Sequence, residues 1–177
     1  MPGFCWTYRL MVLTLLVGFT ACNPPVQEIP SKQTDDVSEK FVKANQYMQR
    51  RHQDHIAAFV NRVGWNATVT SSGLWVVLNT QGSGERILSN SRVTFAFESM
   101  LLDGTPCYSA TEDQPKAITI GKGGAESGVE QGLQMMSEGA EATFIIPPHL
   151  AHGNFGDRDR IPGNTVIIYH VKVIEVQ

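Results

Sequence analysis

The 177-residue sequence has few cysteines and no excess of basic charge. Of its three cysteines, Cys5 and Cys22 lie near the N-terminus and only Cys107 falls in the globular part, which argues against a disulfide framework. The formal net charge of -3 at pH 7 gives no basic footprint, so nucleic acid is not an expected partner.

Metal-ligand patterns are also lacking. The histidine pairs His52 with His55 and His149 with His152 are each close in sequence. No cysteine or carboxylate pattern adds a third ligand to either pair. We therefore expect solvated or packed histidines at these positions, and neither a metal nor a cofactor.

The apolar run that follows Arg9 is too short to span a bilayer comfortably. It covers residues 10–19 and ends just before Thr20-Ala21-Cys22. Such a run is typical of the core of a signal peptide, and small residues before a cysteine resemble a bacterial lipoprotein cleavage site. We therefore predict a signal peptide over residues 1–21 and a lipid anchor on Cys22. This places the protein at the bacterial cell envelope, in the periplasm or facing the outer membrane. Ordinary secretory cleavage and an uncleaved anchor are the alternatives.

A polar segment with three prolines comes next, and an amphipathic stretch follows it. The polar composition of residues 22–35 predicts a flexible tether. Asp36 and Glu39 have the spacing of a capping box, and Gly64 is a stop signal, so a helix is predicted over 36–64. Its apolar side consists of Phe41, Ala44, Met48, His52, Ile56, Phe59 and Val63. This side either packs on the chain's own domain, which is slightly favoured, or pairs with a second copy.

Residues 65–177 contain apolar segments that are typical of a sheet. The expected strands cover residues 74–78, 93–98, 117–120, 142–146 and 166–175. Val93, Phe95 and Phe97 alternate with other side chains, as in a half-buried strand, and Asp103-Gly104 is a hairpin signal.

A glycine-rich loop at residues 121–124 leads into a short helical pattern. Val129, Leu133 and Met136 recur at helical spacing after this loop. Together with the strands, this pattern predicts an α+β fold: a twisted antiparallel sheet half-wrapped around one short helix, preceded by the N-terminal helix.

Several short motifs occur in a fixed order along residues 72–162. They are Ser72-Gly73-Leu74, Asp103-Gly104, Gly132 and Ile161-Pro162, together with the glycine-rich loop. In this order they resemble the FKBP-type peptidyl-prolyl isomerase family. The resemblance runs from about Ser72 to Gln177 and identifies residues 65–177 as an FKBP-type domain. It implies an isomerase that acts on proline-containing polypeptide clients and assists the folding of envelope or secreted proteins. A client-binding chaperone or assembly lipoprotein with little or no turnover is the alternative.

The resemblance also implies which residues form the site. The catalytic set is Phe97, Tyr108, Glu126, Val129, His152, Ile161 and Tyr169, and further substrate contacts come from Cys107, Lys116, Ala125 and Phe155. The backbone N–H of Glu126 is the expected donor to a substrate carbonyl. A shallow apolar depression is expected, with Val129 at its floor in place of the family's tryptophan. Envelope members of the family dimerise through an N-terminal helical segment, so a homodimer through the helix at 36–64 is a further hypothesis.

Overall fold

Residues 31–177 are the part of the chain that the computed structural model describes, with side chains described from residue 37 onward. The predicted signal peptide, Cys22 and the tether as far as Pro30 lie outside the described residues. The chain divides between Val42 and Lys43, and the residues after this point form one compact unit. None of the helices in the described range has both the length and the apolarity needed to cross a membrane.

Helix α2 spans Ser31–Val63, without an interruption by proline or glycine. It begins before the predicted capping box, so the tether prediction is wrong for residues 31–35, and Asp36 lies inside the helix. A local Asp-to-Glu pattern marks a start only where the preceding residues leave the helix, and these do not. Gly64 ends the helix as predicted, with a φ of 72°.

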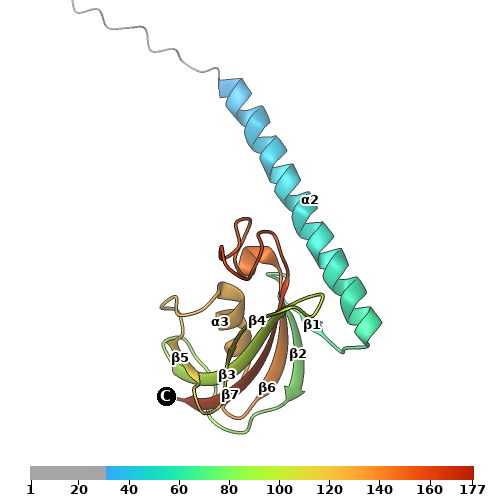
Figure 1. Ribbon diagram of the computed structural model, residues 1–177. Coiled ribbons are helices and arrows are strands. Elements are labelled where there is room, and N and C mark those ends of the chain that lie inside the picture. The colour runs from blue at the N-terminus through green and yellow to red at the C-terminus, as the bar shows by residue number, and fades with distance from the viewer. Residues whose placement is uncertain (1–30) are drawn as a thin grey trace, which may run out of the picture. The chain divides into compact units, whose positions relative to one another are not determined.

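A seven-stranded antiparallel sheet forms the body of residues 43–177. Its strands are β1 (Thr68–Val69), β2 (Trp75–Thr80), β3 (Arg92–Leu101), β4 (Pro106–Ala110), β5 (Lys116–Thr119), β6 (Glu141–Ile146) and β7 (Ile167–Val176). The order across the sheet is β1-β2-β6-β7-β3-β4, and β5 also pairs with β3. Helix α3 (Ser127–Leu133) lies in the curve of the sheet, and a 3-10 turn, Pro148–Leu150, follows β6 (Figure 1). The predicted fold is confirmed.

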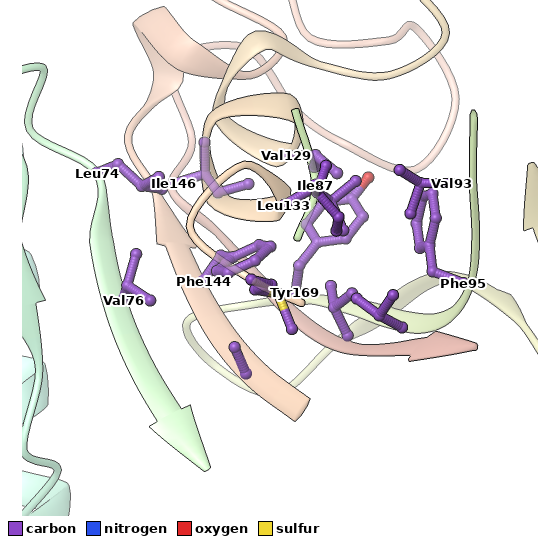
Figure 2. Packing of buried hydrophobic residues seen from close by; sticks show 14 of the residues in the cluster. Leu74, Val76, Ile87, Val93, Phe95, Val129, Leu133, Phe144, Ile146 and Tyr169 are labelled. Atoms are coloured by element: carbon purple, nitrogen blue, oxygen red, sulfur yellow. The ribbon is translucent and has the colours of Figure 1, made fainter. Parts of the chain in front are cut away.

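The main core lies between α3 and the sheet. Val93 and Phe95 of β3 point into it, as their alternation predicted, and Tyr169 of β7 joins them. Figure 2 shows Tyr169 with Val129 of α3 in this cluster. The helix comes close to β6, because a Cβ added at Gly132 would lie 2.6 Å from the ring of Phe144. Gly132 is thus required by close packing and not by a turn.

The other face of the sheet is covered at one end by the second half of α2. Ile56 and Val60 are buried there with Ile145, Val166 and Ile168. The expected packing of the helix on its own domain is therefore observed for this half. Within the predicted apolar side, however, Val63 is 40% exposed and Phe41 is 66% exposed. Val60 takes the inner position in place of Val63, because it lies one turn after Ile56.

Candidate functional site

The residues predicted to form the site come from elements far apart in the sequence. Strand β3 supplies Phe97, β4 supplies Cys107 and Tyr108, the start of α3 supplies Ala125, Glu126 and Val129, the loop after β6 supplies His152 and Ile161, and β7 supplies Tyr169. Eight of these nine pack in or against the main core cluster, or hydrogen-bond directly to a member of it. The ninth, His152, lies 3.0 Å from Glu126. The structure therefore brings this set together.

Phe155 does not belong to this group. Its side chain is 85% exposed, so it neither refills the site nor packs against its wall. The substrate contact expected from Phe155 stays a prediction, since the side chain is accessible but lies apart from the other site residues. In sequence it follows Asn154 and precedes Gly156, where the loop turns with a positive φ of 67°.

An aromatic wall forms one side of the site. The rings of Phe97 and Tyr169 stack with their centroids 5.3 Å apart and their planes at 27°. Phe95 extends the wall inward, at 5.9 Å from Phe97. The ammonium group of Lys116 lies 5.7 Å from the centroid of the Phe97 ring, close enough for a cation–π contact. Lys116 thus reaches the site, and its charge rests on the aromatic wall.

The expected open depression is not what the structure shows at Val129. Val129 is 1% exposed and Ile161 is 2% exposed, so both belong to the packed interior. The reason is the close approach of α3 to the sheet, which presses Val129 into the core beside Tyr169. Val129 is therefore covered in this structure, and its role as the floor of a depression stays a prediction.

Glu126 is the polar group that lies over this apolar base. Its Oε1 accepts a hydrogen bond of 3.0 Å from the hydroxyl of Tyr169, and the same oxygen lies 3.0 Å from Nε2 of His152. Burial, and then the nearby Glu126 carboxylate, raise the pKa of Tyr169 well above its ordinary value. Tyr169 therefore stays a neutral donor, and the contact joins α3, β7 and the loop after β6.

The backbone of Glu126 is also placed for binding. Glu126 is the residue before the first turn of α3, in an extended conformation, and its carbonyl accepts from the N–H of Glu130. Its own N–H donates no hydrogen bond to any residue between 31 and 177. This N–H remains available to a carbonyl, as the sequence comparison with the family implied.

A second polar contact holds the rim between β4 and the loop that leads to β7. The hydroxyl of Tyr108 donates to Oδ2 of Asp157 at 2.5 Å, and the other oxygen of Asp157 accepts from the N–H of Ile161. The Tyr108 hydrogen bond, first among its causes, lowers the pKa of Asp157 to about 2. The same bond raises the pKa of Tyr108 to about 12. At neutral pH the rim therefore pairs a phenol with a carboxylate.

Asp157 and Arg160 were missed by the sequence reasoning. Arg160 donates through Nη1 to the carbonyl of Cys107 at 2.7 Å, and its guanidinium lies 5.3 Å from the ring centroid of Tyr108. The available signal was the repeated Asp-Arg pair at residues 157–160, directly before the Ile161 landmark. A charged repeat of this kind is usually a solvated loop, so its spacing alone did not identify a site.

Cys107 contributes to the base of the site as a small apolar side chain. It is 2% exposed, and burial is the largest cause that raises its thiol pKa. A buried thiol with a raised pKa is a poor nucleophile. Throughout residues 37–177, no three histidine, cysteine or carboxylate side chains are grouped as a metal site.

A separate groove of about 390 Å³ lies mainly on the opposite face of the sheet. His170 and Lys172 of β7 line it, and of the predicted site residues only Phe97 borders it. Lys172 is already paired with Glu112 at 2.7 Å, and Nδ1 of His170 lies 2.9 Å from the hydroxyl of Thr143. This groove is therefore distinct from the group around Glu126.

The fold and the site geometry define a small α+β domain with an aromatic wall, an apolar base and a free backbone donor above it. Comparison with protein families shows which family has this domain. The family described as FKBP-type peptidyl-prolyl cis-trans isomerase matches residues 84–174. The chain belongs to this family, which confirms the resemblance seen in the sequence.

Similar proteins include bacterial members of the family. The chain is 28% identical over 152 residues to a probable FKBP-type peptidyl-prolyl cis-trans isomerase FkpA of Neisseria meningitidis, covering 85% of this chain and 56% of that protein. It covers 42% of the FkpA of Buchnera aphidicola, at 28% identity over 109 residues, or 61% of this chain. The chain thus spans about half the length of these curated relatives.

Solved structures support the fold. A peptidyl-prolyl cis-trans isomerase from Pseudomonas syringae has a TM-score of 0.64 at 24% identity, covering 75% of this chain and 95% of that one. FkpA from Escherichia coli has a TM-score of 0.60 at 23% identity, covering 82% and 71%. At these identities the likeness concerns the fold alone.

Proposed function

We propose that this protein is a peptidyl-prolyl cis-trans isomerase that acts on proline-containing polypeptides. Family membership supports this proposal, and one observation of the site carries it. The stacked rings of Phe97 and Tyr169 and the buried side chains of Ile161 and Val129 adjoin a backbone N–H, on Glu126, that has no partner in the described chain.

This arrangement suits the physical demands of the reaction. Rotation about the bond before proline is slow, because the peptide C–N bond has partial double-bond character. The twisted transition state loses resonance, so a site accelerates the exchange by binding the twisted form better than either planar form. An apolar wall removes water from the imide, and the N–H of Glu126 holds a neighbouring carbonyl. No covalent step is needed.

The Glu126 side chain must move for a substrate to reach the base. In the structure its carboxylate lies over the apolar residues, held by Tyr169 and adjacent to His152. The Glu126 side chain is 17% exposed, so it has a path toward solvent, although this movement breaks its hydrogen bond with Tyr169. Val129 and Ile161, in contrast, are fixed in the core. We therefore propose that substrate binding moves the Glu126 carboxylate toward the rim of the site and leaves the base in place.

A client-binding chaperone with little turnover is the second candidate function. The observation that favours it is the same closed arrangement, because a carboxylate over the apolar base disfavours a proline ring. Binding of an unfolded client requires exposed surface but not the twisted imide. Suppression of client aggregation without any acceleration of prolyl exchange would support this second function.

We further propose that the protein assists folding at the bacterial cell envelope, anchored by a lipid on Cys22. The apolar run at residues 10–19 and the small residues before Cys22 support this location. Cys22→Ser is expected to move the protein from the membrane fraction into the soluble fraction. An unmodified N-terminus in the intact mass of the mature protein would contradict the anchor.

Pairing through α2 remains a proposal for the first half of that helix. Phe41 is 66% exposed and Tyr47 is 63% exposed, in contrast to the buried Ile56. Large exposed apolar side chains on one helix support an interaction surface. Sedimentation of the purified protein tests the proposal: a dimer that Phe41→Ser converts into a monomer supports it, and a monomer at all concentrations contradicts it.

The isomerase function is tested most simply by a refolding experiment. A client whose refolding is limited by a prolyl bond refolds over tens of seconds or longer. The purified protein, at a small fraction of the client concentration, is expected to accelerate this phase. Phe97→Ala is expected to reduce the acceleration, whereas Leu88→Ala, at an exposed position away from the wall, is the matched control. An unchanged slow phase would contradict the proposal.

A further inference from the structure

Two polar atoms of the site are buried and have no hydrogen bond within the described chain. They are Oε2 of Glu126 and Nε2 of His152. The His152 nitrogen lies 3.0 Å from Oε1 of Glu126, without the alignment of a hydrogen bond. Buried polar groups are normally paired, so an unpaired carboxylate oxygen gains from any donor that reaches it.

The surroundings of Glu126 strengthen such a contact. Tyr169, which is 4% exposed, lies on one side and the buried Val129 belongs to the same cluster. A charge-assisted hydrogen bond is stronger beside apolar groups than in water. The group in the site that can still accept a hydrogen bond is therefore the Glu126 carboxylate, since the aromatic wall has no such acceptor.

The other charges near the site have partners of their own. The ammonium of Lys116 lies on the ring of Phe97, and Arg160 donates to the carbonyl of Cys107. Asp157 accepts from Tyr108 and from the N–H of Ile161. Within the described residues neither cation contacts Glu126, and His152 approaches only the oxygen that Tyr169 already uses.

We propose that the Glu126 carboxylate determines substrate preference by accepting a hydrogen bond from a nitrogen donor on the side chain next to the substrate proline. The imide nitrogen carries no hydrogen, so a donor must come from a flanking residue. A lysine or arginine supplies both a donor and a positive charge. The site therefore prefers lysine or arginine beside proline to leucine, and it rejects glutamate there by like-charge repulsion.

This inference rests on the proposed isomerase function, which supplies the reaction. The preference for the residue beside the substrate proline rests on Glu126 alone. Glu126→Gln keeps the size of the side chain and removes its charge, and Glu126→Ile replaces it with an aliphatic side chain. Glu85→Gln is the matched control, because Glu85 is an exposed carboxylate in the segment between β2 and β3 and does not belong to the predicted site. It removes the same charge from the protein.

The experiment compares three peptides that differ only in the residue before proline: lysine, leucine or glutamate. Exchange spectroscopy by NMR gives kcat/KM for each with the purified protein. We expect the lysine peptide to exceed the glutamate peptide by about tenfold or more, from a charge-assisted hydrogen bond. Glu126→Gln is expected to reduce this ratio several-fold, Glu126→Ile to favour leucine, and Glu85→Gln to leave the ratio unchanged.

The outcomes separate this inference from the proposed function. Catalysed exchange with equal rates for the three peptides, or a preference that Glu126→Ile leaves intact, overturns the inference and leaves the isomerase function standing. If no peptide is exchanged, the isomerase function fails, and the same peptides are then titrated against labelled protein. Tighter binding of the lysine peptide that is lost in Glu126→Gln supports Glu126 as a selective binding residue, and equal binding of all three overturns it.

Discussion

Tyr108 illustrates how a site residue depends on a distant loop for its polar partner. The resemblance to the family places Tyr108 in the site, but it does not show which group holds the hydroxyl. In the structure, Asp157 on another loop supplies a carboxylate, and the Tyr108 hydroxyl donates to it. The polar character of the rim therefore depends on two residues from different parts of the chain.

The Tyr108–Asp157 bond predicts a measurable acid titration. The pKa of Asp157 is lowered from 3.8 to about 2, and the hydrogen bond from the Tyr108 hydroxyl is the largest cause of this shift. Tyr108→Phe removes this donor but leaves the N–H groups of Asp159 and Ile161, so the pKa should rise part of the way back. Carbon-detected NMR of the Asp157 carboxyl follows this shift, with Tyr47→Phe as the control.

The sign of the effect on stability follows from the lowered pKa. A carboxyl group whose pKa is lower in the folded state stabilises the fold above its unfolded value, and this contribution is lost as pH falls. For Asp157 the loss is expected between about pH 4 and pH 2. Tyr108→Phe should make the unfolding transition less dependent on pH in this window. An equally steep dependence in wild type and variant would show that the bond does not form in solution.

Helix α3 depends on glycine for its contact with β6. A Cβ at Gly132 would lie 2.6 Å from the Phe144 ring, which is itself fully buried. Gly132→Ala is therefore expected to destabilise the protein by about 1–3 kcal/mol through overpacking, despite the better helix propensity of alanine. Urea unfolding measures this loss. Gln134→Ala, at an exposed site just after the helix, should change stability by less than about 0.5 kcal/mol.

The second half of α2 is expected to contribute to the stability of the domain. Ile56 is 0% exposed in the cluster with Val60, Ile145 and Ile168. Ile56→Ala should lower the free energy of unfolding by about 2–5 kcal/mol, as is usual for a buried isoleucine. Val63→Ala, at 40% exposure, is the control and should have a much smaller effect. Similar small losses for both would mean that the helix is separable from the sheet.

The elements were largely predictable because each carries a local period. The alternation of Val93 and Phe95 and the helical spacing of Val129 and Leu133 both appear in the structure as expected. The burial of Ile168 on the outer face was not predictable, since it depends on a helix more than a hundred residues earlier in the chain. For the same reason the sequence did not show that Val60, and not Val63, faces the sheet.

At the scale of the whole molecule, the resemblance to the family implied which residues meet. It placed Phe97, Glu126 and Tyr169 in one group, and the structure joins them. The sequence did not predict what the side chains do there. The contact of Glu126 with His152 depends on two rotamers and on a loop path, which no residue pattern encodes.

The contacts of Glu126 explain why the site is closed in this structure. Val129 is buried, and the Glu126 carboxylate beside it joins α3, β7 and the loop after β6. Opening requires the Glu126 side chain to rotate away from Tyr169 and His152. The central claim is therefore that the Phe97–Tyr169 wall, once uncovered, binds and twists a prolyl imide.

The most direct test of this claim is the rate of cis-trans exchange in a short prolyl peptide, measured by NMR without a protease. We predict that the purified protein accelerates the exchange, and that Phe97→Ala lowers kcat/KM by about tenfold or more while Leu88→Ala does not, once both variants are shown to be folded. A folded wild-type protein that leaves the exchange rate unchanged, or a Phe97→Ala variant as active as the wild type, would contradict the account.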